Sequence, residues 1–299
     1  GSALIVVQEI REYCSTHYDR KTDAPVRILF NDYKKRIIAN LKENVAEEAC
    51  PRDCCRIEFT VLQFEEALAH ELPLMQEDDC ANLVIMDQFG FKSVTPQVVA
   101  RVLDCGKTDI LFFISSSVVR RFCEQAEIQR RFEIDPSETR DMDYRAIHRY
   151  MCEHYREELK GNDYYLAPFS LKKGGNIYGI IFGTKHPRGL DKFLTACWAL
   201  DGDTGEANFN VDGDIAWGGQ QSLWDEDRSP KKLDHFKKEL ESFVYENSPD
   251  NTQVFLFCLE RGFSGKKARE IATEMLDSGT IWTEPYSAAA SPKKGALYL

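Results

Sequence analysis

The chain has 299 residues, 43% of them hydrophobic, so it is long enough for two domains with a substantial buried core. Its formal net charge of −11 argues against a uniformly basic nucleic-acid binder. No apolar run reaches the length of a membrane span, and no signal peptide is recognised. Ten cysteines at irregular spacings predict a cytoplasmic protein whose thiols are reduced and mostly buried.

Strands and helices are expected to alternate over the first half of the chain. The spacing of Leu4, Ile5, Gln8 and Arg11 predicts a helix at the start. Thr95 can cap a later helix, and Pro96 suits its first turn. The other expected elements are strands over residues 25–30, 56–61, 82–86 and 109–115, and helices over 33–45 and 64–70.

Beyond residue 115 a charged helical region is expected to about residue 160. Two apolar segments then follow, residues 164–171 and 177–184, and the Lys-Lys-Gly-Gly-Asn stretch between them predicts a hairpin. Alternating strands and helices favour a doubly wound α/β fold with a mostly parallel sheet, to which the hairpin adds an antiparallel edge. This pattern is typical of S-adenosylmethionine methyltransferases and fits a plain dinucleotide-binding fold less well.

Such a sheet has a central strand and a glycine-rich turn before its first helix, and neither occurs in the sequence before that helix. Losing a central parallel strand would leave its neighbours without hydrogen-bond partners. We therefore expect an upstream segment that supplies this strand.

The last third of the chain changes in character. An acidic, glycine-rich connector is expected over residues 201–229, after a methyltransferase-like domain at 1–200. Helices at about 230–246, 252–261 and 266–277, followed by strands near 279–285 and 295–299, predict a winged helix-turn-helix domain at 230–299.

Four segments resemble the three-Cys-motif partner proteins (TcmP): GSALIVVQEI, VIMDQFGFK, FFISSSVVRRF and IYGIIFGTKHPRGLDKFLTACW. The resemblance spans most of residues 1–200. It implies a methyltransferase-like Rossmann fold, S-adenosylmethionine as cofactor and a protein partner with a three-cysteine motif. The family tends to read Asp-Pro-Phe-Gly where this chain has Asp87-Gln88-Phe89-Gly90, so Gln88 adds a backbone N–H and a flexible amide.

Two positions after strands are candidates for cofactor binding. Asp32, with Tyr33 beside it, follows the first expected strand, where a carboxylate can accept hydrogen bonds from both ribose hydroxyls of a nucleoside. Asp32 can equally cap the helix that begins at Tyr33. Gln63 lies where methyltransferases often place an acid that accepts the adenine amino group.

Asp87 ends a strongly apolar strand, at the edge where ligands bind in parallel sheets. It is expected to contact the amino-acid end of the cofactor or a substrate amine, and the alternative is a turn carboxylate bonded to nearby amides. Gln88 and Phe89 complete the expected catalytic group, with Phe89 as either a stacking or a core aromatic.

Cations at two places are candidate nucleic-acid contacts: Lys172 and Lys173 in the hairpin, and Lys266, Lys267 and Arg269 at the start of the last helix. His186 is expected to cap the helix that starts near Arg188. No metal site is expected, because the only cysteine cluster, 50–55, lacks suitable spacing and a fourth ligand.

The favoured function is that of an S-adenosylmethionine-dependent methyltransferase, or a close relative of one, acting on or binding nucleic acid. The alternative is a non-catalytic protein that uses the fold as a platform for its three-cysteine-motif partner. A nicotinamide-dependent oxidoreductase fits less well because of the closing hairpin.

Overall fold

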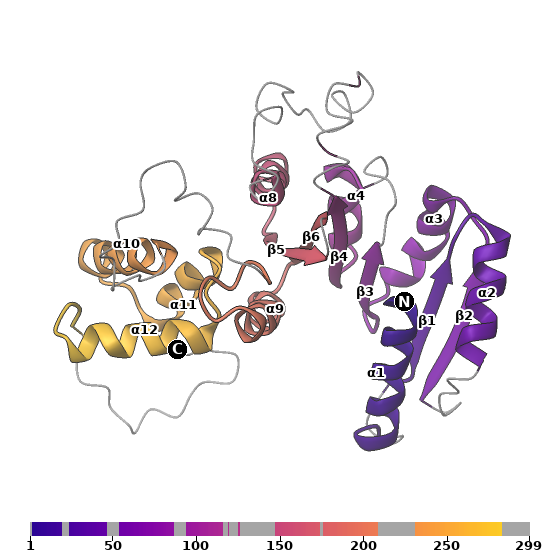
Figure 1. Ribbon diagram of the computed structural model, residues 1–299, viewed down its shortest axis with the longest axis horizontal. Coiled ribbons are helices and arrows are strands. Elements are labelled where there is room, and N and C mark those ends of the chain that lie inside the picture. Colours follow the sequence, from indigo (N-terminus) through magenta and orange to yellow (C-terminus); the bar gives the residue numbers. More distant parts are fainter. Residues whose placement is uncertain are drawn as a thin grey trace. The chain divides into compact units, whose positions relative to one another are not determined.

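The computed structural model of the protein describes residues 2–19, 24–46, 54–86, 94–115, 147–173, 176–208 and 231–282, and the single residues 119 and 125. In these residues nine helices and six strands form a mixed α/β structure (Figure 1). The chain divides into two compact units, Gly1–Gln76 and Glu77–Leu299.

The first unit is a two-stranded parallel sheet with three helices. Strand β1 pairs with β2 so that Val26 lies opposite Cys55 and Asn31 lies opposite Thr60. Its elements are α1 (Ser2–Thr16), β1 (Val26–Asn31), α2 (Lys35–Ala46), β2 (Cys55–Thr60) and α3 (Phe64–Met75).

The two faces of this small sheet are covered differently. On one face, Ile28 packs in an apolar cluster with Val7 and Cys14 of α1 and Val45 of α2. On the other face, Arg27 forms ion pairs with Glu58 of β2 and with Glu71 of α3. Helix α3 is therefore joined to the sheet through a charged contact, whereas α1 and α2 are held by apolar burial.

The second unit is built on a mixed sheet of order β3-β4-β6-β5. Strands β3 and β4 are parallel, and β6 runs antiparallel to both β4 and β5. The elements here are β3 (Ala81–Met86), α4 (Pro96–Leu103), β4 (Lys107–Ser115), α8 (Ile147–Glu158), β5 (Tyr165–Lys173), β6 (Asn176–Thr184) and α9 (Pro187–Leu200).

Helices lie on both faces of this sheet. On one face the Tyr155 ring of α8 packs against Phe112 of β4, with 5.1 Å between the ring centroids. On the opposite face Phe193 of α9 stacks on Phe182 of β6 at 4.8 Å. The register places Phe112 and Phe182 on opposite faces, because Phe112 is paired with Ile181. The unit therefore has the layered α/β arrangement that the sequence predicts.

Three helices follow in the same unit: α10 (Lys231–Asn247), α11 (Asn251–Glu260) and α12 (Gly265–Asp277). They share an aromatic core in which Phe236 stacks on Phe263 at 3.7 Å. Phe255 and Leu259 of α11 pack with Leu190 of α9, which ties these helices to the sheet layer.

Most expected helices and strands are present within one to three residues, although α3 continues five residues past its expected end at residue 70. The strands differ from expectation in forming two sheets instead of one. The helices of the expected winged helix-turn-helix are present. In the first expected wing strand, residues 279–282 form a turn and a bend and no strand, whereas residues 283–285 and the second expected strand, 295–299, lie outside the described residues.

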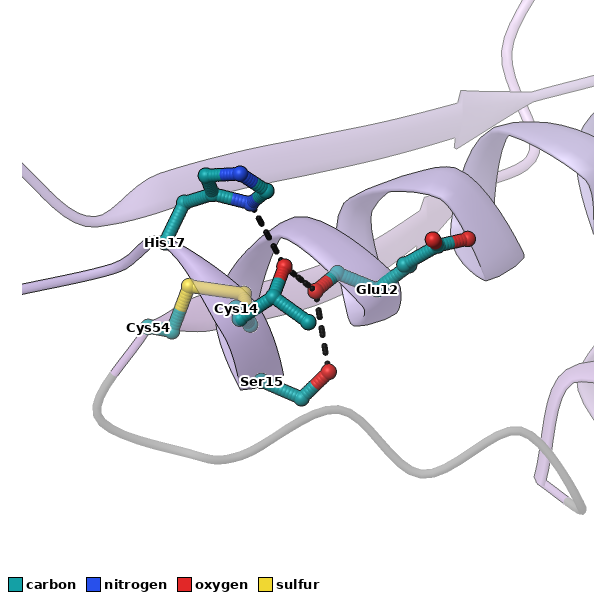
Figure 2. The surroundings of a disulfide bond; sticks show 6 residues. Glu12, Cys14, Ser15, His17 and Cys54 are labelled. Carbon is teal, nitrogen blue, oxygen red and sulfur yellow. Dashed lines mark hydrogen bonds between the residues drawn. A yellow bond between two sulfur atoms is a disulfide. The ribbon is translucent and has the colours of Figure 1, made fainter.

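The expectation of reduced thiols is wrong for one pair, because Cys14 of α1 forms a disulfide with Cys54 (Figure 2). The other cysteines among the described residues are free, and Cys105, Cys152, Cys197 and Cys258 are buried as expected. No helix of the described residues has the length and apolar character needed to cross a membrane.

Candidate functional site

Three of the expected cofactor-binding residues lie at one edge of the first unit. Strands β1 and β2 are parallel and end in register at Asn31 and Thr60. The chain continues from β1 into Asp32 and Tyr33, and from β2 towards Gln63. Because parallel strands end at the same edge, Asp32, Tyr33 and Gln63 are brought to a common edge, as the sequence predicts.

The Asp32 carboxylate bonds to the backbone just before α2. Its Oδ1 atom accepts a hydrogen bond of 2.7 Å from the backbone N–H of Lys34. Among the described residues its other carboxyl oxygen makes no hydrogen bond, and the side chain is only partly buried. Helix α2 begins at Lys35, two residues later than expected, so Asp32 closes a turn just before the helix and is not its N-cap.

The other two residues are more exposed. The Tyr33 side chain is 57% exposed, and Lys34 Nζ lies 5.1 Å from the centre of its ring. Gln63 is the N-cap residue of α3, and its backbone N–H donates to Glu66 Oε2 over 3.3 Å. Gln63 is exposed at the same edge as Asp32.

Asn31, which was not among the predicted site residues, organises this edge. The Asn31 Oδ1 atom accepts hydrogen bonds from the Thr60 hydroxyl, at 2.9 Å, and from the Leu62 backbone N–H, at 3.1 Å. Its Nδ2 group donates to the Leu62 carbonyl over 3.2 Å. These bonds fix the chain between β2 and α3 and so position Gln63. The sequence pattern that could have identified it is an amide side chain at the end of an otherwise apolar strand.

The three residues of the expected catalytic group, Asp87, Gln88 and Phe89, lie outside the described residues. Strand β3, which precedes them, ends at the buried residue Met86. The role of Asp87 therefore stays a prediction.

The cations of the hairpin flank an ordered contact between β5 and the segment after α9. The backbone N–H of Lys172 donates to Asn208 Oδ1 at 2.7 Å, and Asn208 Nδ2 donates back to the Lys172 carbonyl at 3.3 Å. Lys172 is exposed, whereas the side chain of Lys173 is outside the described part.

The three cations of α12 are not equivalent. Lys266 and Arg269 are exposed, as a phosphate contact requires. Lys267 is engaged within the protein, since its Nζ lies 5.1 Å from the Trp198 ring centre and 3.6 Å from Glu270 Oε2. The start of α12 is also fastened to α9, because the Gly265 N–H donates to Asp191 Oδ1 at 2.8 Å.

A charged cluster joins α8, the segment after α9 and α10. The Glu206 carboxylate forms ion pairs with Lys232 Nζ at 2.7 Å and with Arg149 Nε at 2.5 Å. Burial raises the pKa of this carboxyl, but the two cations outweigh burial and leave its pKa lowered. Lys232 Nζ also lies 4.9 Å from the Phe263 ring centre. Glu206 is thus paired within the fold with both cations.

His186 is a helix cap, as expected. Its Nδ1 atom accepts the Arg188 backbone N–H at 3.1 Å, at the start of α9. Within the described chain no group of three or more His, Cys, Asp or Glu side chains could hold a metal ion. Cys54, part of the cysteine cluster, is committed to its disulfide with Cys14.

Comparison with models of known protein families and with curated proteins finds no match to this chain.

Proposed function

We propose that this protein is an S-adenosylmethionine-dependent methyltransferase, or a close relative with the same fold, that acts on or binds nucleic acid. The proposal includes a methyltransferase-like Rossmann sheet with its central strand upstream, a C-terminal winged helix and a three-cysteine-motif protein as partner. The neighbour relations among the strands support it best.

If the upstream strand is taken as the first, the described strands are the second to the seventh. In a doubly wound sheet, the third strand pairs with the second on one side of the first, and the fourth pairs with the fifth on the other. Those are the two parallel pairs of this chain, β2 with β1 and β3 with β4. The antiparallel hairpin then follows β4, as expected for this class of sheet.

The exposure of β3 supports the same conclusion. Leu83 and Ile85 project from one face of this strand and are 62% and 38% exposed. Strands of parallel sheets are normally buried on both faces, so two exposed aliphatic side chains indicate that a further element covers them. An added strand and its helix would do so.

In this proposal Asp32 holds the ribose of the cofactor through its open carboxyl oxygen, and Gln63 contacts the base. Asp87, Gln88 and Phe89 would lie at the methyl-transfer end. Transfer itself depends on holding the methyl group and the acceptor in line more than on a strong base.

Isothermal titration calorimetry with S-adenosylmethionine, on the protein that carries its upstream segment, tests this function. We expect saturable heat, and Asp32→Asn should weaken binding about tenfold because a charge-assisted hydrogen bond to the ribose is lost. The side-chain oxygen of asparagine can also accept the Lys34 N–H and form the same turn, so the start of α2 should stay intact.

Asp250→Asn is the matched control. Asp250 caps α11 by accepting the Gln253 N–H at 2.8 Å, so the same substitution is made at a helix start outside the first unit. No heat at ligand concentrations up to about 1 mM would reject the enzyme function. The non-catalytic platform for a three-cysteine-motif partner would then be the remaining candidate.

Nucleic-acid binding by α12 is tested separately. Lys266→Gln with Arg269→Gln should weaken binding of duplex DNA or RNA and flatten its salt dependence, since both cations are exposed. Lys267→Gln should have less effect, because Lys267 contacts Trp198 and Glu270.

A further inference from the structure

The first turn of α2 and the residues just before it form an exposed basic and aromatic surface, which we name the α2 patch: Tyr33, Lys34, Lys35, Arg36 and Ile37. All five side chains are exposed, with Tyr33 at 57% and Ile37 at 42%. Lys34, Lys35 and Arg36 are three consecutive cations beside an exposed ring, in a chain of net charge −11.

Within the described residues the three cations make no ion pair with a carboxylate. In the described part of the chain no ion pair includes Lys34, Lys35 or Arg36, although Arg27 and Arg56 of the same unit both form one. The first turn of α2 contains no acidic residue. The nearby Asp32 carboxylate accepts the Lys34 backbone N–H.

Stability of the helix does not explain these cations. The positive end of the helix dipole lies at the first turn, so cations there are unfavourable and carboxylates favourable. Helix α3 follows that rule, with Glu65 and Glu66 in its first turn, and α2 breaks it. Among the described residues Lys34 contacts only the Tyr33 ring and none of the three cations is neutralised by a carboxylate, so their charge is available to an anionic ligand.

The apolar groups of the patch narrow the class of ligand. Tyr33 and Ile37 are exposed next to the cations in the sequence, so the patch carries an aromatic and an aliphatic side chain as well as positive charge. Cations that track phosphates, together with an exposed ring on which a base can stack, are the two components of single-strand binding sites.

We propose that the α2 patch binds single-stranded nucleic acid, with Lys34, Lys35 and Arg36 on the phosphates and Tyr33 stacked on a base. This inference rests on the nucleic-acid part of the proposed function and deepens it by naming a surface other than α12. In this inference the Tyr33 ring stacks on a base of the nucleic acid and does not contact the cofactor. A strand bound there passes the open oxygen of Asp32, at the edge proposed for the cofactor.

Fluorescence anisotropy with a labelled oligouridine of about 20 nucleotides tests the proposal on the whole chain. The triple variant Lys34→Gln, Lys35→Gln, Arg36→Gln should bind more weakly. Each lost phosphate contact lowers the slope of log affinity against log salt by about 0.7, so the magnitude of the slope should fall by about 2. Tyr33→Ala should weaken binding about tenfold, and Tyr33→Phe should retain it.

The control triple variant Arg188→Gln, Lys192→Gln, Lys238→Gln removes the same charges from exposed positions of the second unit. It should bind the oligonucleotide like the unchanged protein. Loss of fold is not expected in the α2 variant, because removing cations from a helix start favours the helix. Thermal melts by circular dichroism check this.

The outcomes separate the two proposals. If the unchanged protein binds oligouridine but the α2 variant binds equally well, this inference is wrong and the proposed function stands. If both triple variants lose affinity alike, binding reflects overall charge and the inference also fails. Binding only to vesicles of phosphatidylcholine and phosphatidylserine, and not to oligouridine, overturns this inference. Oligouridine binding with no heat from S-adenosylmethionine would leave the α2 patch valid and reject the enzyme.

Discussion

His148 on α8 and Ser170 on β5 form a buried polar pair, with 3.1 Å between His148 Nδ1 and Ser170 Oγ. The His148 ring is fully buried, and it also bonds to the Ile114 backbone. Burial lowers the pKa of His148 to about 4, although the bond to Ile114 acts in the opposite direction. A neutral imidazole therefore joins α8 to the sheet.

This pair predicts that the second unit loses stability in mildly acidic solution. The folded pKa of about 4 is below the ordinary value of 6.5, so the unfolded chain takes up a proton first as the pH falls. The stability that neutral His148 contributes is complete above pH 6.5 and is lost as the pH falls towards 4. The free energy of unfolding should decrease by about 2 kcal/mol between pH 7.5 and pH 4.5 on this account.

Urea unfolding followed by tryptophan fluorescence measures this effect, because all four tryptophans follow residue 197 and so report the second unit. His148→Gln is the comparison, since glutamine keeps a polar side chain and removes the titration. The variant should be less stable at pH 7.5 but should lose less on acidification. Equal losses in the two proteins would show that His148 does not cause the acid sensitivity.

Gly179 should be essential for the same contact. A Cβ atom added to Gly179 of β6 would overlap the His148 ring, which cannot move away because it is enclosed. Gly179→Ala should therefore lower the free energy of unfolding by about 2–3 kcal/mol. Gly202→Ala is the matched control, since a Cβ atom there meets nothing within 4 Å. A small effect of Gly179→Ala, similar to the control, would contradict the close contact.

Local signals in the sequence predicted the elements well, and the structure gives the reason. Thr95 caps α4 by accepting the Val98 N–H at 3.3 Å, and His186 caps α9, so the contacts that start these helices involve residues two or three positions apart. Chemistry of this range can be recognised from sequence.

Long-range contacts could not be predicted in the same way. The helical spacing of His148, Met151, Cys152 and Tyr155 marks one face of α8, but burial of the imidazole depends on Gly179, which is 31 positions away along the chain. Likewise, Cys54 stood out as part of a cluster, yet nothing local identifies Cys14 as its partner. Asn31 was missed because its partners, Thr60 and Leu62, come from the next strand.

The charged contact between β1 and α3 should stabilise the first unit above about pH 4.5. The hydrogen bonds from Arg27 lower the pKa values of Glu71 and Glu58 below their ordinary value of 4.5. A lowered carboxyl pKa contributes stability that is present above this value and is lost as the pH falls through the folded pKa. Arg27→Gln should cost about 1 kcal/mol at pH 7, because the pairs are partly screened by solvent.

Hydrogen exchange of the β1 and β2 amides measures this, because the first unit contains no tryptophan. Exchange should be faster in Arg27→Gln at pH 7, and the difference should shrink near pH 3 after correction for intrinsic rates. Arg56→Gln is the control, since among the described residues Arg56 forms an ion pair with Glu58 alone and its side chain is 79% exposed. A difference that persists unchanged at low pH would show that Arg27 acts through packing.

The disulfide between Cys14 and Cys54 should contribute more than any of these polar contacts. It joins α1 to the start of β2 across a separation of 40 residues, beside the apolar cluster that holds α1 on the sheet (Figure 2). Closing a loop of this length restricts the unfolded chain and stabilises the fold by about 2–4 kcal/mol. Cys14→Ala with Cys54→Ala should lower the free energy of unfolding of the first unit by that amount.

Dithiothreitol should have the same effect on the unchanged protein and none on the double variant, with hydrogen exchange of α1 and β2 as the measurement. Cys80→Ala is the control, because Cys80 is a free and partly buried thiol in the second unit. Exchange in α1 should accelerate more than exchange in β2. Strand β2 keeps its hydrogen bonds to β1, whereas α1 is joined to the sheet by its apolar side and this one covalent bond. If α1 is equally protected with and without the reductant, the apolar packing of α1 is sufficient to hold the helix, and the disulfide has no part in it.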